Sequence, residues 1–294
     1  MKPQELWELA SKPIAGEHKR TKLVVSDIEG CLNLDEKTYD HEALAWIRLA
    51  NQLASPRNAI PFITVCSGRQ HAFVEAIVRM IAGRMPAIFE NGCGLFFPTR
   101  GLYDEYEWHP SLNQSDVASE YAKTRQIVAE ICNRTGARRV IGKEVLLTLH
   151  PAPPMTATEL YRTVASTFSA IGIQASVSNS ASAVDIAPLG IDKGIGLQWL
   201  VTKVAEEFPL ELSQVAGIGD SKGDLPFLRI VGFSAAPANA AEELRAMVTY
   251  CSPASDGKGV ADIIQQCIAS NLKHGEGEEE VYHESIRLSS QELG

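Results

Sequence analysis

Short apolar runs of strand length alternate with helix-like segments along the first ninety residues, and this alternation restricts the fold more than any other feature. The runs 22–26, 60–65 and 87–89 are rich in apolar residues, many of them β-branched, which is typical of parallel strands buried on both faces. Between them, 44–53 and 70–82 place apolar side chains at helical spacing. The order strand, helix, strand, helix, strand predicts an α/β fold with a doubly wound, Rossmann-like parallel sheet.

The pattern changes at about Cys93, where a different kind of unit begins. We expect a short hairpin over 94–106, a helix over 118–133, an alternating strand at 144–150, a helix over 156–171 and more extended chain at 173–186. Thr156 and Glu159 have the spacing of a capping box at the start of the second helix. Two helices on a small, largely antiparallel sheet are therefore predicted for this insert.

The parallel rhythm returns from Asp192, so the insert divides the first domain. We predict a helix to about Glu207, a strand at 215–218, a helix at 225–230, and a further strand and helix that end near Ala269. The predicted domains are a core formed by 19–92 plus 186–270, an α+β domain at 93–185, and an acidic C-terminal tail at 271–294. A cleft is expected between the core and the insert.

The composition excludes several classes of protein. The 294 residues carry 27 Lys and Arg against 36 Asp and Glu, a net charge of −9, which argues against a nonspecific nucleic-acid binder or a polybasic membrane partner. The six cysteines are scattered without a C-x-x-C pair, so neither a disulfide framework nor a zinc site is indicated. No stretch approaches the roughly 18 apolar residues that span a bilayer, and residues 1–20 lack the apolar core of a secretory signal. We therefore expect a cytoplasmic protein whose partners are neither nucleic acid nor membrane.

Four polar clusters follow predicted strands or begin predicted helices. They are Asp27-Ile28-Glu29-Gly30, Ser67-Gly68-Arg69, Lys193-Gly194 and the run from Gly219 to Asp224. Because ligands of open α/β sheets bind outside the carboxyl ends of the strands, we expect these clusters to meet at one edge. Their carboxylates would repel one another without a cation, and hard oxygen ligands favour Mg²⁺. A hydroxyl and a lysine beside them suit a phosphate group, so the indicated chemistry is attack by one carboxylate on phosphorus, through an aspartyl-phosphate.

The four clusters resemble the motifs of the haloacid dehalogenase-like (HAD) superfamily. Asp27 to Leu32 resembles the first motif, usually D-x-D-G-T-L, and the others resemble the later motifs in order: Ser67-Gly68-Arg69, Asp192-Lys193-Gly194 and Gly219-Asp220-Ser221-x-x-Asp224. The insert, preceded by Glu90-Asn91-Gly92, resembles the type-two cap of subclass IIB. That subclass includes sucrose-phosphate and mannosyl-3-phosphoglycerate phosphatases and many sugar phosphatases. The resemblance covers about Lys22 to Ala269 and implies a phosphatase with a Rossmann-like core and an inserted α+β cap.

This resemblance implies a role for each residue that matches a motif. Asp27 is the expected nucleophile, Glu29 occupies the general acid/base position, and Lys193 would stabilise the transferring phosphate. Substrate binding is expected from Ser67, Gly68, Arg69 and Asn91. Magnesium binding is expected from Asp27, Glu29 through its backbone carbonyl, Asp220 directly, and Asp224 directly or through a water.

Glu29 departs from the family pattern, because most phosphatases of the superfamily have Asp at that position. The carboxyl group is retained but reaches one methylene further, and a displacement of about 1 Å can cost about 100-fold in rate. Slow or selective turnover is therefore a consequence that the sequence leaves open.

The predicted function is a Mg²⁺-dependent phosphomonoester hydrolase acting on a small phosphorylated metabolite, either a sugar phosphate or a phosphoglycerate derivative. Two alternatives stay open: a phosphotransferase or phosphomutase that uses the same intermediate, and a metal- and phosphate-binding regulatory protein with little turnover. The protein is expected to be a monomer or a homodimer. The insert also carries a basic cluster, which we interpret as a solvated face, with contact to a second anionic group of the substrate as the alternative: Arg134, Arg138, Arg139 and Lys143.

Overall fold

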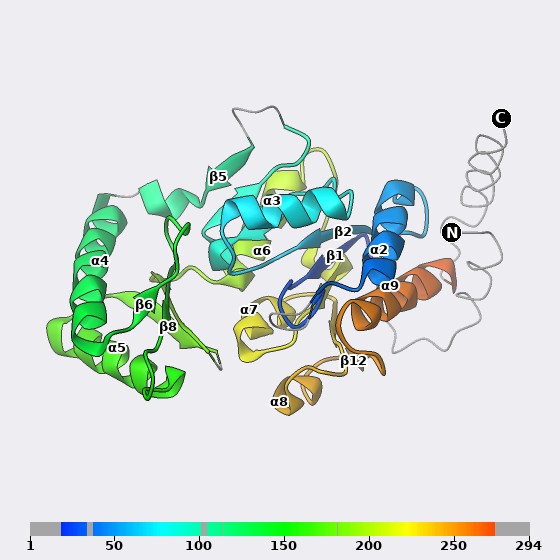
Figure 1. Ribbon diagram of the computed structural model, residues 1–294. Helices are drawn as coiled ribbons and strands as arrows, with labels where there is room; N and C mark the ends of the chain where they lie inside the picture. Colours follow the sequence, from blue (N-terminus) through cyan, green and yellow to red (C-terminus); the bar gives the residue numbers. More distant parts are fainter. Residues whose placement is uncertain (1–18, 34–37, 101–104, 114, 181, 274–294) are drawn as a thin grey trace.

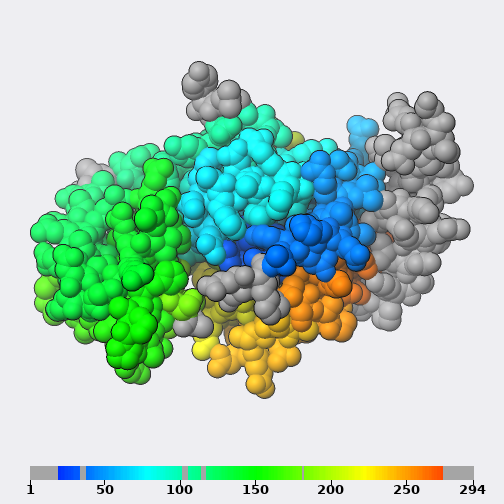
Figure 2. Space-filling view, in the orientation of Figure 1, coloured from blue at the N-terminus to red at the C-terminus, as the bar shows by residue number. Residues whose placement is uncertain are grey.

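The computed structural model describes residues 19–33, 38–100, 105–113, 115–180 and 182–273. Two bodies stand beside each other in Figure 1: a larger core and a smaller cap, by which we mean residues 115–188. Each has its own hydrophobic cluster. The space-filling view shows the green cap in contact with the cyan part of the core (Figure 2).

A five-stranded parallel sheet forms the centre of the core. Its order is β12-β11-β10-β1-β2, and every neighbouring pair runs parallel. The strands are β1 (Leu23–Ser26), β2 (Phe62–Val65), β10 (Val215–Ile218), β11 (Phe233–Ala236) and β12 (Tyr250–Cys251). Every residue of β1, β2 and β10 is buried, as expected for apolar runs covered on both faces. The predicted α/β fold is confirmed.

Helices follow the strands, and all but the short helix over 242–245 lie where the sequence predicts a helix. They are α2 (His41–Leu53), α3 (His71–Met80), α6 (Lys193–Val204), α7 (Leu225–Leu228), α8 (Glu242–Arg245) and α9 (Asp256–Lys273). Helix α2 packs against α9, and α6 packs against α7. Short 3₁₀ turns flank β10, η3 (Leu212–Gln214) before it and η4 (Lys222–Asp224) after it. No helix in the described part of the chain is long and apolar enough to cross a membrane.

The third predicted strand, β3 (Ala87–Phe89), is not a full member of the parallel sheet. It pairs antiparallel with β4 (Gly94–Phe96), which pairs in turn with β5 (Tyr106–Trp108). Only an isolated bridge between Cys66 and Ile88 joins it to the end of β2. The chain reverses in η1 (Glu90–Gly92), where three successive residues have positive φ. That turn sends β4 back along β3, and both strands pack into the core cluster.

The cap is an α+β unit, as the pattern after Cys93 predicts. Its sheet has the order β6-β7-β9-β8 and is antiparallel throughout. The strands are β6 (Arg138–Arg139), β7 (Leu147–His150), β8 (Ala175–Asn179) and β9 (Val184–Pro188), and the helices are α4 (Ser115–Thr135) and α5 (Ala157–Ile171), with the 3₁₀ turn η2 (Pro110–Asn113) ahead of α4. The predicted capping box between Thr156 and Glu159 is present at the start of α5.

The predicted tail at 271–294 lies mostly outside the described residues. Its first three residues complete α9. Asn271 is buried there and donates to the carbonyl oxygens of Thr21 and Ala59, 2.8 Å from each. The end of α9 is therefore hydrogen-bonded to the segments that precede β1 and β2.

Candidate active site

The carboxyl end of β1 places Asp27 at the centre of the site. The Asp27 amide donates to the carbonyl of Ile218 in β10 (2.9 Å), and its side-chain Oδ1 accepts from the amide of Ile28 (2.7 Å). The chain then turns at Gly30, where φ is +76°. A Cβ at this position would overlap the Asp220 carboxylate, so glycine both permits the turn and lets Asp220 approach it.

Asp224 organises the loop that follows β10. It is fully buried, and its Oδ2 accepts from the amides of Asp220 and Ser221, each at 3.0 Å, and from the Ser221 hydroxyl at 3.3 Å. Its Oδ1 accepts from Lys193 Nζ at 2.7 Å. The carboxylate therefore fixes the loop backbone and a neighbouring cation at the same time.

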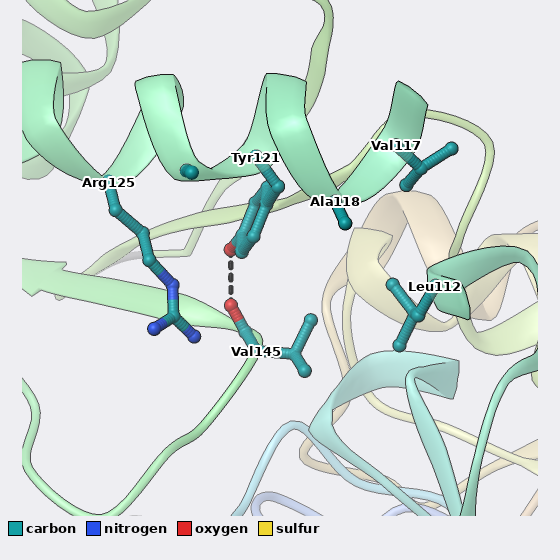
Figure 3. Close-up of a pocket in the computed structure, with 7 residues that line it drawn as sticks. Leu112, Val117, Ala118, Tyr121, Arg125 and Val145 are labelled. Carbon is teal, nitrogen blue, oxygen red and sulfur yellow. Dashed lines mark hydrogen bonds between the residues drawn. The ribbon is translucent and has the colours of Figure 1, made fainter. Parts of the chain in front are cut away.

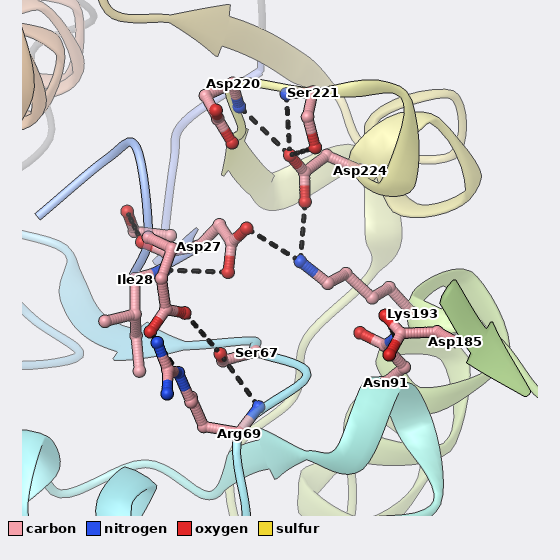
Figure 4. A network of polar contacts seen from close by, with 12 residues as sticks. Asp27, Ile28, Ser67, Arg69, Asn91, Asp185, Lys193, Asp220, Ser221 and Asp224 are labelled. Carbon is pink, nitrogen blue, oxygen red and sulfur yellow. Dashed lines mark hydrogen bonds and ion pairs between the residues drawn. The ribbon is translucent and has the colours of Figure 1, made fainter. Parts of the chain in front are cut away.

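Lys193 begins α6 and points its ammonium between two carboxylates. The helix starts there because the Asp192 side chain caps it, accepting from the amide of Ile195 at 2.9 Å. Lys193 Nζ lies 2.9 Å from Asp27 Oδ2 and 2.7 Å from Asp224 Oδ1. Burial opposes its charge, but the carboxylates of Asp224 and Asp27 outweigh burial and raise the pKa of Lys193. This lysine stays charged beside the predicted nucleophile (Figure 4).

The carboxylates of Asp27, Asp220 and Asp224 form a cluster suited to a divalent cation. One oxygen of each lies within 4.8 Å of the others, in the described part of the chain. Burial raises the pKa of Asp27 well above its usual range, Lys193 opposes the shift, and the charges of Asp224, Glu29 and Asp220 add to it. Three carboxylates therefore lie close enough to repel one another, and Lys193 pairs with two of them, Asp27 and Asp224. Carboxylate oxygens are the ligands that Mg²⁺ prefers, and a divalent ion would offset the repulsion among them.

Glu29 is the exception among the four carboxylates expected to converge. Its Oε2 accepts from the Ser67 hydroxyl at 3.2 Å, and its Oε1 pairs with Arg69 Nε. The Ser67 hydroxyl also accepts from the Arg69 amide at 3.2 Å. The longer side chain of Glu29 therefore lies on the Ser67 and Arg69 side of Asp27, and its backbone carbonyl as a magnesium ligand stays a prediction.

Gly68 and Asn91 lie against each other at the border with the cap. A Cβ on Gly68 would come within 3.0 Å of Asn91 Oδ1, and the Asn91 amide donates to the Ser67 carbonyl at 3.0 Å. Asn91 has a φ of +55°, and its Nδ2 donates to Asp185 Oδ2 of the cap at 3.3 Å. The second-motif loop, Asn91 and the cap are thus in one polar chain (Figure 4).

Glu90 is a further functional candidate. The sequence pattern places it in the Glu90-Asn91-Gly92 motif but assigns it no role. It is 1% exposed, and its carboxylate accepts from three successive cap amides, those of Glu144 (2.9 Å), Val145 (2.8 Å) and Leu146 (2.7 Å). Burial raises the pKa of Glu90, and these three hydrogen bonds oppose the shift. The residue fastens the cap loop 144–146 to the core next to Asn91.

The basic cluster of the cap divides into two parts. Arg134, Arg138 and Arg139 are exposed, as the interpretation of a solvated face predicts. Lys143 contradicts that interpretation, because it is half-buried and its Nζ donates to Thr148 Oγ1 at 2.6 Å. The fold buries it because the neighbouring loop 144–146 is bound to Glu90.

A cavity of about 260 Å³ opens elsewhere, beside α4. Leu112, Tyr121, Arg125 and Val145 are among its lining residues, and the Tyr121 hydroxyl donates to the Val145 carbonyl (Figure 3). None of the predicted site residues lines this cavity, so it is separate from the carboxylate cluster.

Known proteins of one superfamily resemble both the sequence and the fold. The model of a haloacid dehalogenase-like hydrolase family matches residues 149–264. A phosphoglycolate phosphatase of Methanothermobacter thermautotrophicus is 25% identical over 245 residues, which cover 83% of this chain and 98% of that protein. The sucrose-phosphatase of Synechocystis sp. PCC6803 has a TM-score of 0.62 at 17% identity, covering 84% of this chain and 98% of that one. The HAD subclass IIB sugar phosphatase BT4131 has a TM-score of 0.61 at 16% identity, covering 83% and 98%.

Together with the parallel sheet and the four motifs at its edge, these matches make HAD-like hydrolases the class of protein that this chain resembles. The chain is similar in sequence to haloacid dehalogenase-like hydrolases, and its parallel-sheet core with an inserted α+β cap is similar in fold to the subclass IIB sugar phosphatase. The predictions of the superfamily and of an enzyme are confirmed.

Proposed function

We propose that this protein is a Mg²⁺-dependent phosphomonoester hydrolase that acts on a small phosphorylated metabolite through an aspartyl-phosphate on Asp27. One observation carries the proposal: Asp27 is buried beside Lys193, in a cluster where one oxygen of each of three carboxylates lies within 4.8 Å of the others. A buried carboxylate next to a fixed cation is arranged to attack a charged phosphate.

The proposed reaction has two steps. An oxygen of Asp27 attacks phosphorus, the ester P–O bond breaks, and Glu29 gives a proton to the leaving oxygen. Glu29 then takes a proton from water, whose oxygen attacks the same phosphorus and releases phosphate from Asp27. Lys193 and the Ser67 hydroxyl hold the phosphate oxygens during both steps.

Asp27 and Asp220 are the residues we propose as direct protein ligands of Mg²⁺, with Asp224 fixing their loop and orienting a bound water. When bound, Mg²⁺ would neutralise negative charge on the transferring phosphate. Asp224 suits the supporting role because its two oxygens already accept from Lys193 and from the loop amides. Support of this kind is normal around metal ligands.

The substrates we propose are sugar phosphates or phosphorylated small acids such as phosphoglycerate derivatives. Relatives named phosphoglycolate phosphatase, from Methanothermobacter thermautotrophicus and Methanococcoides burtonii, keep small acids in this set. We also propose a cytoplasmic location, since the six cysteines are free thiols.

Phosphate release from a panel of sugar phosphates and phosphorylated acids tests the proposal, measured with Mg²⁺ and with EDTA. We expect release with Mg²⁺ and its loss in EDTA, and equal rates in both would contradict the metal-dependent mechanism. Adding acceptor sugars separates hydrolysis from phosphotransfer, because a phosphotransferase would form a new phosphate ester in place of free phosphate.

A further inference from the structure

Lys143 is a cation of the cap that the proposed mechanism does not use. It lies between β6 and β7, half-buried, next to the loop that Glu90 binds. Burial lowers its pKa, the carboxylates of Asp185 and Glu90 partly offset burial, and the charges of Arg69 and Glu29 also act on it. Residues of the second and first motifs are therefore its electrostatic neighbours, although they belong to the core.

A short polar chain connects Lys143 to the substrate-binding motif. Lys143 Nζ donates to Thr148 Oγ1 at 2.6 Å, and Thr148 Oγ1 donates to Asp185 Oδ1. Asp185 Oδ2 accepts from Asn91 Nδ2 at 3.3 Å, and Asn91 lies against Gly68. In Figure 4 the side chains of Asn91 and Asp185 lie against each other. Lys143 is thus two hydrogen bonds from Asp185 and three from Asn91, at the side of the site that faces the cap.

The balance of donors and acceptors in this region favours an anionic ligand. The acceptors are already engaged, since Glu90 accepts three backbone amides and Asp185 accepts from Thr148 and Asn91. An ammonium group has three N–H donors, and the bond to Thr148 uses one of them. A ligand reaching Lys143 would therefore be bound through its own acceptors, and a carboxylate gives the strongest charge-assisted hydrogen bonds.

We propose that Lys143 binds a carboxylate on the leaving group of the substrate, so that the preferred substrates are small phosphorylated carboxylic acids. The proposal rests on the phosphatase function proposed above, because it assigns the cap side of that site. It distinguishes acids from neutral sugar phosphates, which offer Lys143 no anionic group once the phosphate is held at Asp27.

Two substrates that differ only in the relevant group test the proposal: phosphoglycolate and 2-hydroxyethyl phosphate, in which a neutral CH₂OH replaces the carboxylate. The proteins to compare are the wild type, Lys143→Met, Lys143→Arg and, as a control, Arg139→Met at an exposed basic position of the same cap. Lys143→Met should lower kcat/KM for phosphoglycolate about 30-fold, mainly through KM, and change that for 2-hydroxyethyl phosphate less than about 2-fold. Lys143→Arg should restore part of the loss, and Arg139→Met should change neither value.

Equal losses on both substrates, or none on phosphoglycolate, would overturn the role of Lys143. The ligand-induced rise in melting temperature, measured for both compounds with Mg²⁺, gives an answer that does not depend on turnover. A wild type that binds phosphoglycolate through Lys143 but hydrolyses neither compound would refute the proposed phosphatase while supporting this inference. A wild type that neither binds nor hydrolyses phosphoglycolate would refute the inference, while release of phosphate from neutral esters would retain the proposed function.

Discussion

Replacing Glu29 by Asp tests whether the longer side chain is adapted to catalysis. Glu29 Oε2 lies 3.2 Å from Ser67 Oγ, and Oε1 pairs with Arg69 Nε. Removing one methylene withdraws the carboxylate by about 1.5 Å, which breaks the hydrogen bond to Ser67 and misplaces the acid/base group. A misplacement of about 1 Å costs about 100-fold, so we expect kcat to fall about 100-fold, or about 2.7 kcal/mol in activation free energy.

The assay is steady-state phosphate release with saturating Mg²⁺, together with the melting temperature of each protein. The ion pair of Glu29 and Arg69 is partly exposed and contributes at most about 1 kcal/mol to stability, so Glu29→Asp should stay folded. Glu75→Asp is the matched control, because Glu75 pairs with Arg79 outside the site at 2.7 Å. A large gain of activity in Glu29→Asp over a nearly inactive wild type would refute this reasoning and favour the regulatory protein.

Three further predictions follow from single contacts. Glu90→Gln should lower the free energy of unfolding by about 2 kcal/mol, because it loses the hydrogen bond from the Glu144 amide and weakens those from the Val145 and Leu146 amides. Urea unfolding measures this loss, and the exposed control Glu144→Gln should show none. The Mg²⁺-induced rise in melting temperature should be larger at pH 8 than at pH 5.5, because the raised pKa of Asp27 lets a proton compete with the metal as the pH falls; a rise independent of pH would contradict it. Gly30→Ala should weaken Mg²⁺ binding, measured by calorimetry, because its Cβ would displace Asp220, whereas Gly190→Ala has a similar positive φ in open space and should leave binding unchanged.

The sign of the pH effect follows from the direction of the shift. In the metal-free protein the raised pKa of Asp27 means that its protonated form is favoured in the folded state. That contribution to stability is complete below the ordinary Asp pKa of 3.8 and is lost as the pH rises through the raised value. Mg²⁺ therefore adds most stability above the raised pKa, where it replaces no proton.

Periodicity and motif order predicted the parts of the fold that depend on local pattern. The runs that became β1, β2 and β10 are mostly apolar, and such parallel strands end at one edge of the sheet, so Asp27 and Asp220 meet there. Lys193 reaches Asp27 from the start of α6. The place of β3 could not be predicted in the same way. Its pairing depends on three positive φ values from Glu90 to Gly92, and although Asn and Gly favour such a backbone, Glu does not.

The positions of side chains whose partners lie far along the chain could not be predicted from the sequence either. The Glu29 side chain was expected to converge with the other three carboxylates, but the ion pair with Arg69 holds it on the Ser67 side. Lys143 was interpreted as exposed, like its basic neighbours. In the structure, Glu90, more than fifty positions earlier, binds the adjacent loop to the core. Burial of one charged residue in a cluster is decided by such tertiary contacts and not by charge pattern.

The most direct test of the mechanism compares phosphate release by the wild type and Asp27→Asn, using one hydrolysed monoester at saturating Mg²⁺. Asparagine keeps the size of the side chain but cannot form the aspartyl-phosphate, so the account predicts a loss of more than about 1,000-fold in kcat. A melting temperature measured on the same sample confirms that the variant is folded. Full activity in folded Asp27→Asn would contradict the central claim that this carboxylate is the nucleophile.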